Sequence, residues 1–169
     1  MRPRRTRTRA LQRGSSVLYV VVLSPVLLLS VALATEVGGL QMEKERVRSA
    51  LDQSTVVAAA AASRAGEGLS IDTARAIAVA RDVLAANLAP LLPVFPGSSA
   101  AGIARAADIA VITDVPAPNP FDPRDVIRHP SIAMRVRVPL HTGLFAAAGL
   151  PAVETVTLTS TAALRETGQ

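Results

Sequence analysis

The chain has 169 residues, which is the length of one ordinary domain. Half of the residues are apolar and only 18% are charged, a balance that excludes an intrinsically disordered chain. The four aromatic side chains are too few for a protein that binds nucleic acid by stacking bases on rings. The absence of cysteine excludes disulfides, thiolate metal sites and thiol nucleophiles.

The formal net charge of +5 is concentrated at the N-terminus. Residues 1–13 hold six arginines and no acidic residue, whereas the rest of the chain holds 12 basic and 13 acidic side chains. A basic tail of this kind binds nucleic acid or anionic lipid, or fixes the orientation of a membrane protein. The segment that follows favours the last role. We interpret six residues as a topology signal, namely Arg2, Arg4, Arg5, Arg7, Arg9 and Arg13.

Residues 14–35 contain no charged side chain. As a helix they extend about 33 Å, which is enough to cross a hydrocarbon core of about 30 Å. We therefore predict a cytoplasmic tail over residues 1–13 and a transmembrane helix over residues 14–35, with the chain from about residue 36 outside. The predicted location is the plasma (inner) membrane, crossed once.

A second interpretation of the same segment stays open. The small-x-small triplet Ala-Leu-Ala at residues 32–34 follows an apolar run over residues 17–31, as at the cleavage site of a secretory signal peptide. Cleavage after Ala34 would release a soluble protein beginning at Thr35. Against this, no helix breaker separates the run from the triplet, and the helical pattern continues past Thr35.

For residues 36–64 the sequence predicts an extracytoplasmic continuation of the same helix. The whole helix would then have about 48 residues and a length of about 70 Å. A mostly apolar stripe runs along one side of this helix, in steps of three and four residues, with Lys44 and Ser54 filling two of the steps. Its residues are Val37, Leu40, Lys44, Val47, Leu51, Ser54, Ala58 and Ala61. The other side is either a solvated surface or a packing face for another helix, and it carries Glu43, Glu45, Arg46, Arg48 and Asp52. Pro25 should kink or loosen this helix, because proline lacks the N–H group and clashes one turn back.

Residues 65–169 predict a small α+β domain with Pro-rich loops. Gly66-Glu67-Gly68 ends the long helix, and Asp72 is a suitable N-cap for a second helix over residues 73–89. The predicted buried side of that helix carries Ile77, Ala80, Leu84 and Leu88. Eight of the twelve prolines lie in residues 90–130, which predicts mostly loop there, with one strand over residues 108–115.

Two sharper alternating patterns follow. The first places five apolar side chains on one face of a strand, namely Ile132, Met134, Val136, Val138 and Leu140. The second pattern covers residues 155–164, with the threonines facing outward. Between the two strands, the sequence predicts a short helix over residues 142–149. Strict alternation indicates strands that bury one face only, so we expect a three- or four-stranded antiparallel sheet. Its core is thin, and we expect the long helix to complete the packing.

The sequence contains no pattern typical of catalysis. Neither His129 nor His141 has a carboxylate or second histidine at helical spacing, and the phosphate-binding and nucleophile-elbow motifs are absent. Three oxygen-bearing residues could suggest calcium, but prolines interrupt them and we interpret them as turn formers: Asn119, Asp122 and Asp125. We expect no enzyme activity, metal, cofactor, small-molecule substrate or nucleic-acid partner.

The order of features resembles the N-terminal segment of the TadE/TadG-like family. The chain has an arginine-rich start, Gly14, an apolar run with a central Pro25 and, after it, an alanine block at residues 58–62. The positions that match the family motif are Glu36, Gly38, Val47, Ala50 and Asp52. Members of this family are minor pilin or pseudopilin components of tight-adherence (Flp-type) pilus systems, which are related to type IV pili. Residues 131–165 resemble the family's C-terminal part more loosely.

The resemblance implies a pilin-like fold and a structural or assembly role in a pilus or related secretion apparatus, by helix packing in the membrane. Its partners would be other pilin-like or secretion-machinery subunits, or further copies of itself. Close packing of membrane helices needs small residues, and with Pro25 we assign this role to Ala32, Ala34, Gly38 and Gly39. Prepilin-type processing would cut between Gly14 and Ser15. Tyr19 then stands where type IV pilins carry a glutamate, so the chain is closer to the TadG-like variant that stays uncut.

Two other functions stay open from the sequence. One is a single-pass membrane protein whose outer domain binds a ligand or partner through the strand face that carries Arg135 and Arg137. The other is a secreted soluble protein released after Ala34. Because no nucleophile, base or metal set converges in the sequence, neither alternative indicates an enzyme.

Overall fold

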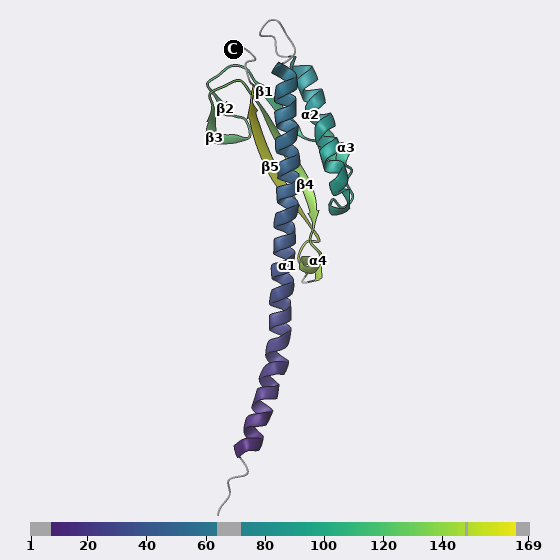
Figure 1. The fold of residues 1–169 in the computed structure, drawn as a ribbon, viewed down its shortest axis with the longest axis vertical. Helices are drawn as coiled ribbons and strands as arrows, with labels where there is room; N and C mark the ends of the chain where they lie inside the picture. Colours follow the sequence, from purple (N-terminus) through teal and green to yellow (C-terminus); the bar gives the residue numbers. More distant parts are fainter. Residues whose placement is uncertain (1–7, 64–71, 148, 165–169) are drawn as a thin grey trace, which may run out of the picture. The chain divides into compact units, whose positions relative to one another are not determined.

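The computed structural model of the chain describes residues 8–63, 72–147 and 149–164. The chain divides into two compact units, Met1–Gly39 and Leu40–Gln169, and the first helix contributes to both (Figure 1). The elements in chain order are α1 (Thr8–Ser63), α2 (Thr73–Leu88), the 3-10 helix η1 (Ala89–Val94), α3 (Ala100–Arg105), β1 (Asp108–Ile112), β2 (Ala117–Asn119), β3 (Asp122–Ile127), β4 (Ser131–His141), α4 (Gly143–Ala147) and β5 (Val153–Ala163).

Helix α1 is a single helix of 56 residues, which confirms the prediction that the apolar segment and the amphipathic segment are continuous. It begins at Thr8, earlier than the predicted start at residue 14. Pro25 lies inside it, and helical backbone continues on both sides. The predicted helix breaker at residues 66–68 lies outside the described residues.

In the second unit, the part of α1 from Leu40 onward is the spine of the hydrophobic core. Its buried apolar side chains are Leu40, Val47, Ala50, Leu51, Ala58, Ala59 and Ala62. The predicted stripe is correct at Leu40, Val47, Leu51, Ser54 and Ala58, whereas Val37 is 43% exposed, Lys44 and Ala61 are only partly buried, and Ala62 is buried. Ser54 and Thr55 are also buried, and each hydroxyl donates to the carbonyl four residues back, which removes the cost of burying it.

Helix α2 packs beside α1 and begins as predicted. The Asp72 carboxylate accepts a hydrogen bond from Arg75 N at 2.9 Å and so caps the helix. The predicted buried residue Ile77 is wrong, because the fully buried stripe runs in steps of four from Ala76 and leaves Ile77 half-buried. Asn87 Nδ2 donates to Ser54 Oγ at 3.3 Å, which joins α2 to α1.

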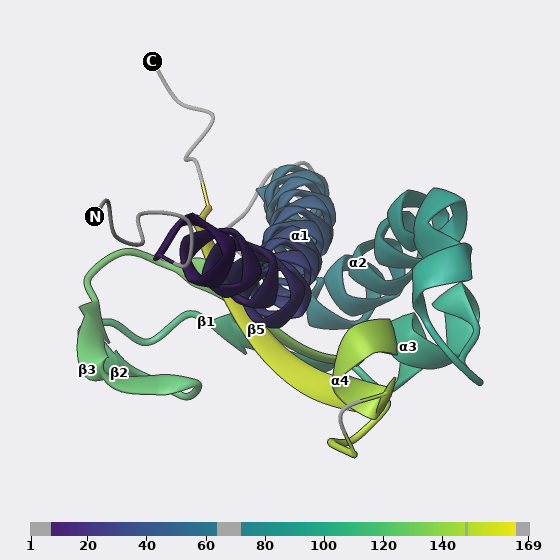
Figure 2. The ribbon, with the colours of Figure 1, turned by 90° about the horizontal axis from the view of Figure 1, so that it is seen from below.

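The sheet is antiparallel, with the strand order β1-β4-β5, and α1 and α2 cover one of its faces (Figure 2). The predicted inward side chains of β4 are all buried, which confirms the alternation. Strand β5 pairs with β4 over its whole length without a bulge, from Val153 opposite His141 to Ala163 opposite Ser131. Ala133 lies on the opposite, outer face of β4 and is buried as well. Its register partner Thr161 accepts a hydrogen bond from Asn119, so the β2–β3 hairpin covers this part of the outer face.

The prediction that residues 90–130 are mostly loop is wrong. The segment holds η1, α3 and three strands, and β1 ends at Ile112 rather than at residue 115. The prediction treated the prolines as evidence for loop. Proline is tolerated in edge strands, however, and both strands of the two-stranded β2–β3 ribbon are edge strands. Ser99 Oγ accepts from Gly102 N at 3.0 Å and caps α3, a local signal that the sequence analysis did not use.

Candidate functional site

The largest feature without a structural partner among the described residues is the apolar surface of the first unit. Fourteen large apolar side chains between Val17 and Val37 are 43–70% exposed. The two hydroxyls near the end of the segment are satisfied within the helix, since Ser30 Oγ donates to Val26 O at 2.8 Å and Thr35 Oγ1 to Val31 O at 2.9 Å. An apolar surface of this extent marks a membrane or protein contact.

Among the described residues, α1 is the one helix that is long and apolar enough to cross a membrane. A helix satisfies its backbone hydrogen bonds internally, which is the condition for crossing the lipid. Residues 17–34 would extend about 27 Å as a helix, close to the thickness of a hydrocarbon core. By its length and composition α1 could therefore span a membrane.

The small residues assigned to helix packing leave the helix surface accessible. A Cβ atom placed on Gly38 or Gly39 would meet no atom within 4 Å. Ala34 is exposed and Ala32 is partly exposed. Ala34 and Gly38 are four residues apart and lie on one side of α1, which is the small-xxx-small spacing that lets two helix backbones approach.

The residues that match the family motif divide between two roles. Val47 and Ala50 are 1% and 6% exposed and belong to the core of the second unit. Asp52 is exposed and Glu36 is partly exposed, both on α1. The motif therefore includes fold-forming positions as well as candidate contacts.

The candidate processing site and part of the topology signal lie at the start of α1. The bond between Gly14 and Ser15 is in helical backbone, as are Arg9 and Arg13. The other arginines of the signal lie outside the described residues, namely Arg2, Arg4, Arg5 and Arg7.

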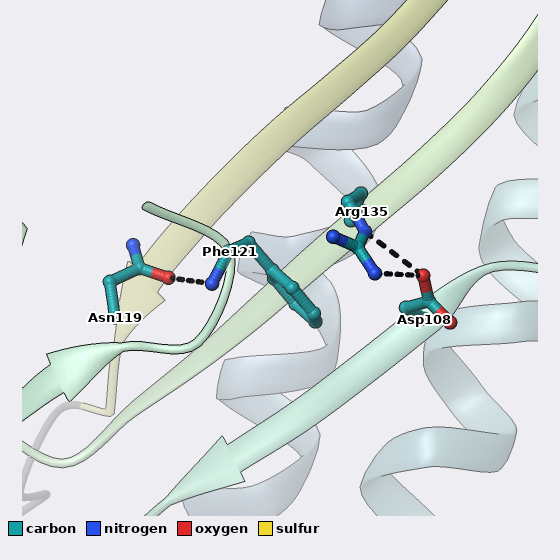
Figure 3. A network of polar contacts seen from close by, with 4 residues as sticks. All are labelled: Asp108, Asn119, Phe121 and Arg135. Carbon is teal, nitrogen blue, oxygen red and sulfur yellow. Dashed lines mark hydrogen bonds and ion pairs between the residues drawn. The ribbon is translucent and has the colours of Figure 1, made fainter. Parts of the chain in front are cut away.

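A polar network occupies the outer face of the sheet (Figure 3). Arg135 Nε and Nη2 donate to Asp108 Oδ2 at 2.9 and 2.7 Å, and the guanidinium carbon lies 4.8 Å from the centre of the Phe121 ring. Phe121 N in turn donates to Asn119 Oδ1 at 3.0 Å. Arg135 therefore already uses its charge and its flat face for contacts within the fold. Arg137 is exposed.

The interpretation of the acidic residues as turn formers is confirmed for Asp122 but not for Asp125, which lies inside β3. Asp122 Oδ1 accepts from Arg124 N at 3.1 Å, and Asn119 Nδ2 donates to Asp125 Oδ2 at 3.1 Å. The first is an Asx-turn contact at the start of β3, whereas the second joins two side chains across the hairpin, with Asp125 inside β3. Among the described residues, no group of three or more His, Cys, Asp or Glu side chains could hold a metal ion.

A shallow depression on the second unit offers no chemistry. It is open to solvent and is lined by Glu43, Arg46, Val47, Leu91, Val94 and Phe95. Its rim carries one carboxylate and one guanidinium beside apolar side chains, without a nucleophile. The candidate site of this chain is thus a surface on α1 rather than a pocket.

Comparison of the chain with family models, with curated proteins and with solved structures found no match in any of the three. The chain's own residues and geometry therefore carry the functional argument.

Proposed function

We propose that the chain is a membrane-anchored assembly subunit that resembles the TadE/TadG-like minor pilins and joins a tight-adherence type pilus or a related secretion apparatus. The observation that carries this proposal is the exposed apolar surface of α1 between Val17 and Val37, in a helix whose residues from Leu40 onward form the core of an α+β unit. One helix would thus serve as anchor, assembly surface and structural spine.

The energetics of the apolar segment favour membrane insertion. Leucine and valine residues each favour insertion by about 0.3–0.6 kcal/mol near the centre of a spanning helix. The segment contains no charged residue to oppose them, and its serine and threonine hydroxyls donate to helix carbonyls. Membrane insertion removes these apolar side chains from water, which is favourable, whereas in water they would remain exposed.

The orientation follows from the arginine tail. Six arginines precede the segment, and positively charged flanks stay on the cytoplasmic side. The second unit would then lie outside the plasma (inner) membrane, where it is available to an envelope assembly. The subunit acts by packing and catalyses no reaction.

The packing surface would be the side of α1 that carries Ala34 and Gly38. Without a hydrophobic driving force between helices in lipid, association depends on close van der Waals contact, which small residues permit. The neighbour would be an α1 helix of a second copy or the membrane helix of another subunit.

Cysteine cross-linking tests this proposal directly, because the chain contains no native cysteine. We expect Ala34→Cys, expressed in its native membrane, to form a covalent adduct with a second copy or another subunit on oxidation. Leu33→Cys is the matched control, since it lies at the same depth but about 120° around the helix from the centre of the proposed surface. Equal cross-linking of both variants, or of neither, would contradict packing through this surface.

A further inference from the structure

We call residues 142–153, which lead from β4 into the first residue of β5, the tip of the second unit. The tip carries no charged side chain. Residues 138–153 contain no Asp, Glu, Lys or Arg, whereas Arg137 and Glu154 flank them directly. Three large apolar side chains of this tip are exposed, Leu144 by 43%, Leu150 by 56% and Val153 by 41%. Exposed apolar side chains gathered in one uncharged segment indicate a contact surface rather than the scattered exposure of an ordinary domain.

The described residues of the tip, 142–147 and 149–153, are held in a defined conformation. Thr142 Oγ1 donates to Pro151 O at 2.6 Å, and Leu150 N donates to Phe145 O at 2.8 Å. Gly149 has φ +80°, a left-handed conformation that closes the turn after α4 and that residues with a side chain rarely adopt. Phe145 packs against the hydrophobic core. The fold thus fixes this tip while leaving its other large apolar side chains outward.

The tip lies at the end of the second unit where α1 enters it. Figure 1 shows α4 at this end, and Lys44 Nζ of α1 lies 4.0 Å from Glu154 Oε1, near the start of β5. Lys44 is one helical turn from Leu40, the first residue of the unit. The apolar segment of α1 directly precedes Leu40 in the chain.

The chain leaves little room between this end and a membrane that α1 would span. From Thr35 to Leu40 a helix rises about 7.5 Å, and the polar layer of a bilayer leaflet is about 5–8 Å thick. The second unit would therefore begin at the outer limit of the lipid headgroups. An uncharged apolar tip at that level can enter the headgroup layer without desolvating an ion.

We propose that this tip, residues 142–153, docks on the lipid surface and so sets the orientation of the second unit. The inference rests on the proposed membrane anchor. The partner is the boundary between headgroups and acyl chains. Because the tip carries no basic side chain, docking depends on burial of Leu144, Leu150 and Val153 and does not require anionic lipid.

Tryptophan fluorescence tests the docking, because the chain has no tryptophan of its own. The full chain carrying Leu150→Trp is reconstituted into phosphatidylcholine vesicles, with and without bromine near the headgroup end of one acyl chain. We expect bromine to lower the emission of the indole at position 150 by about two-fold, as for a side chain buried about 5–10 Å into the interface. The matched control is Val126→Trp, which replaces a side chain of similar exposure (54%) on β3.

A second variant, Leu144→Trp, guards against a local effect of the substitution at position 150, and it should be quenched as well. Quenching of neither tip variant, in vesicles that retain the protein after alkaline extraction, would overturn the docking while leaving the anchor intact. Equal quenching at position 126 would also overturn it. Loss of the protein from the vesicles on extraction would overturn the anchor and the docking together. A tip that contacts another protein instead would stay unquenched in pure lipid.

Discussion

Arg135 and Asp108 face each other across β4 and β1, and two guanidinium nitrogens of Arg135 donate to one carboxylate oxygen of Asp108. The same guanidinium lies over the ring of Phe121, which belongs to the β2–β3 turn. One side chain therefore joins two strands of the main sheet to the hairpin. On the outer face of the sheet this contact adds to the hydrogen bond from Asn119 to Thr161, which also joins the hairpin to the sheet.

Removing the ring should loosen the hairpin. Phe121→Ala deletes the surface over which the guanidinium lies, an interaction of about 0.5–1 kcal/mol at a partly exposed position. We expect faster amide hydrogen exchange over residues 117–127 in the full chain in detergent, with little change in the sheet. Val126→Ala, at an exposed position of the same hairpin, should leave exchange unchanged. Identical exchange in the two variants would show that the ring does not hold the hairpin.

Shortening a core side chain of α1 should destabilise the second unit strongly. Leu51 is fully buried between α1 and the rest of the core, so Leu51→Ala should lower the free energy of unfolding by about 2–5 kcal/mol. Val56 is 58% exposed on the same helix, and Val56→Ala should change it by less than about 0.5 kcal/mol. Urea unfolding of the full chain in detergent, followed by circular dichroism, measures both. Equal effects would mean that this part of α1 is not the core spine.

The sequence predicted the regular elements of this fold better than its irregular segment. Periodicity was sufficient for α1, α2, β4 and β5, because each buries one face against many partners and the pattern repeats over several turns or residue pairs. It failed for the β2–β3 hairpin, whose strands are short, proline-containing and fixed by single polar contacts such as Asn119 to Thr161. Contacts of this kind join residues far apart in sequence and leave no local pattern.

The candidate site was predictable in part for the same reason. The uncharged segment before Thr35 is visible in the sequence, because exclusion of charge needs no knowledge of contacts. The contacts of Arg135 are not visible in the sequence, because its partners Asp108 and Phe121 come from other segments of the chain. The apolar tip around Leu150 was seen only as a short helix, because its exposure depends on how the turn closes at Gly149.

Loss of the cap at the start of α2 should weaken that helix. Asp72→Ala removes the acceptor for Arg75 N and should lower the free energy of unfolding by about 1 kcal/mol. Asp82→Ala is the control, because Asp82 is exposed within α2 and outside the cap, and it should cause no loss. The two variants are compared by urea unfolding. A loss at position 82 as large as that at position 72 would argue against a capping role.

Neutralising the arginine tail should disturb the orientation of the protein. With all six arginines changed to glutamine, the charge asymmetry across the segment disappears, and we expect a mixed population instead of one orientation. A single cysteine placed at exposed Val126 reports the side of the membrane, through labelling of intact cells with an impermeant thiol reagent. The parent chain with the same cysteine should be labelled fully. Unchanged full labelling of the neutralised variant would show that another feature sets the orientation.

The most direct test of the central claim is the N-terminus and molecular mass of the protein in membrane and culture-fluid fractions. The account predicts a membrane-bound chain that is intact or begins at Ser15, and in either case retains the apolar segment of α1. A start at Ser15 would add that prepilin-type processing tolerates Tyr19. A soluble chain that begins at Thr35 would contradict the anchor, because the segment that carries it would have been removed.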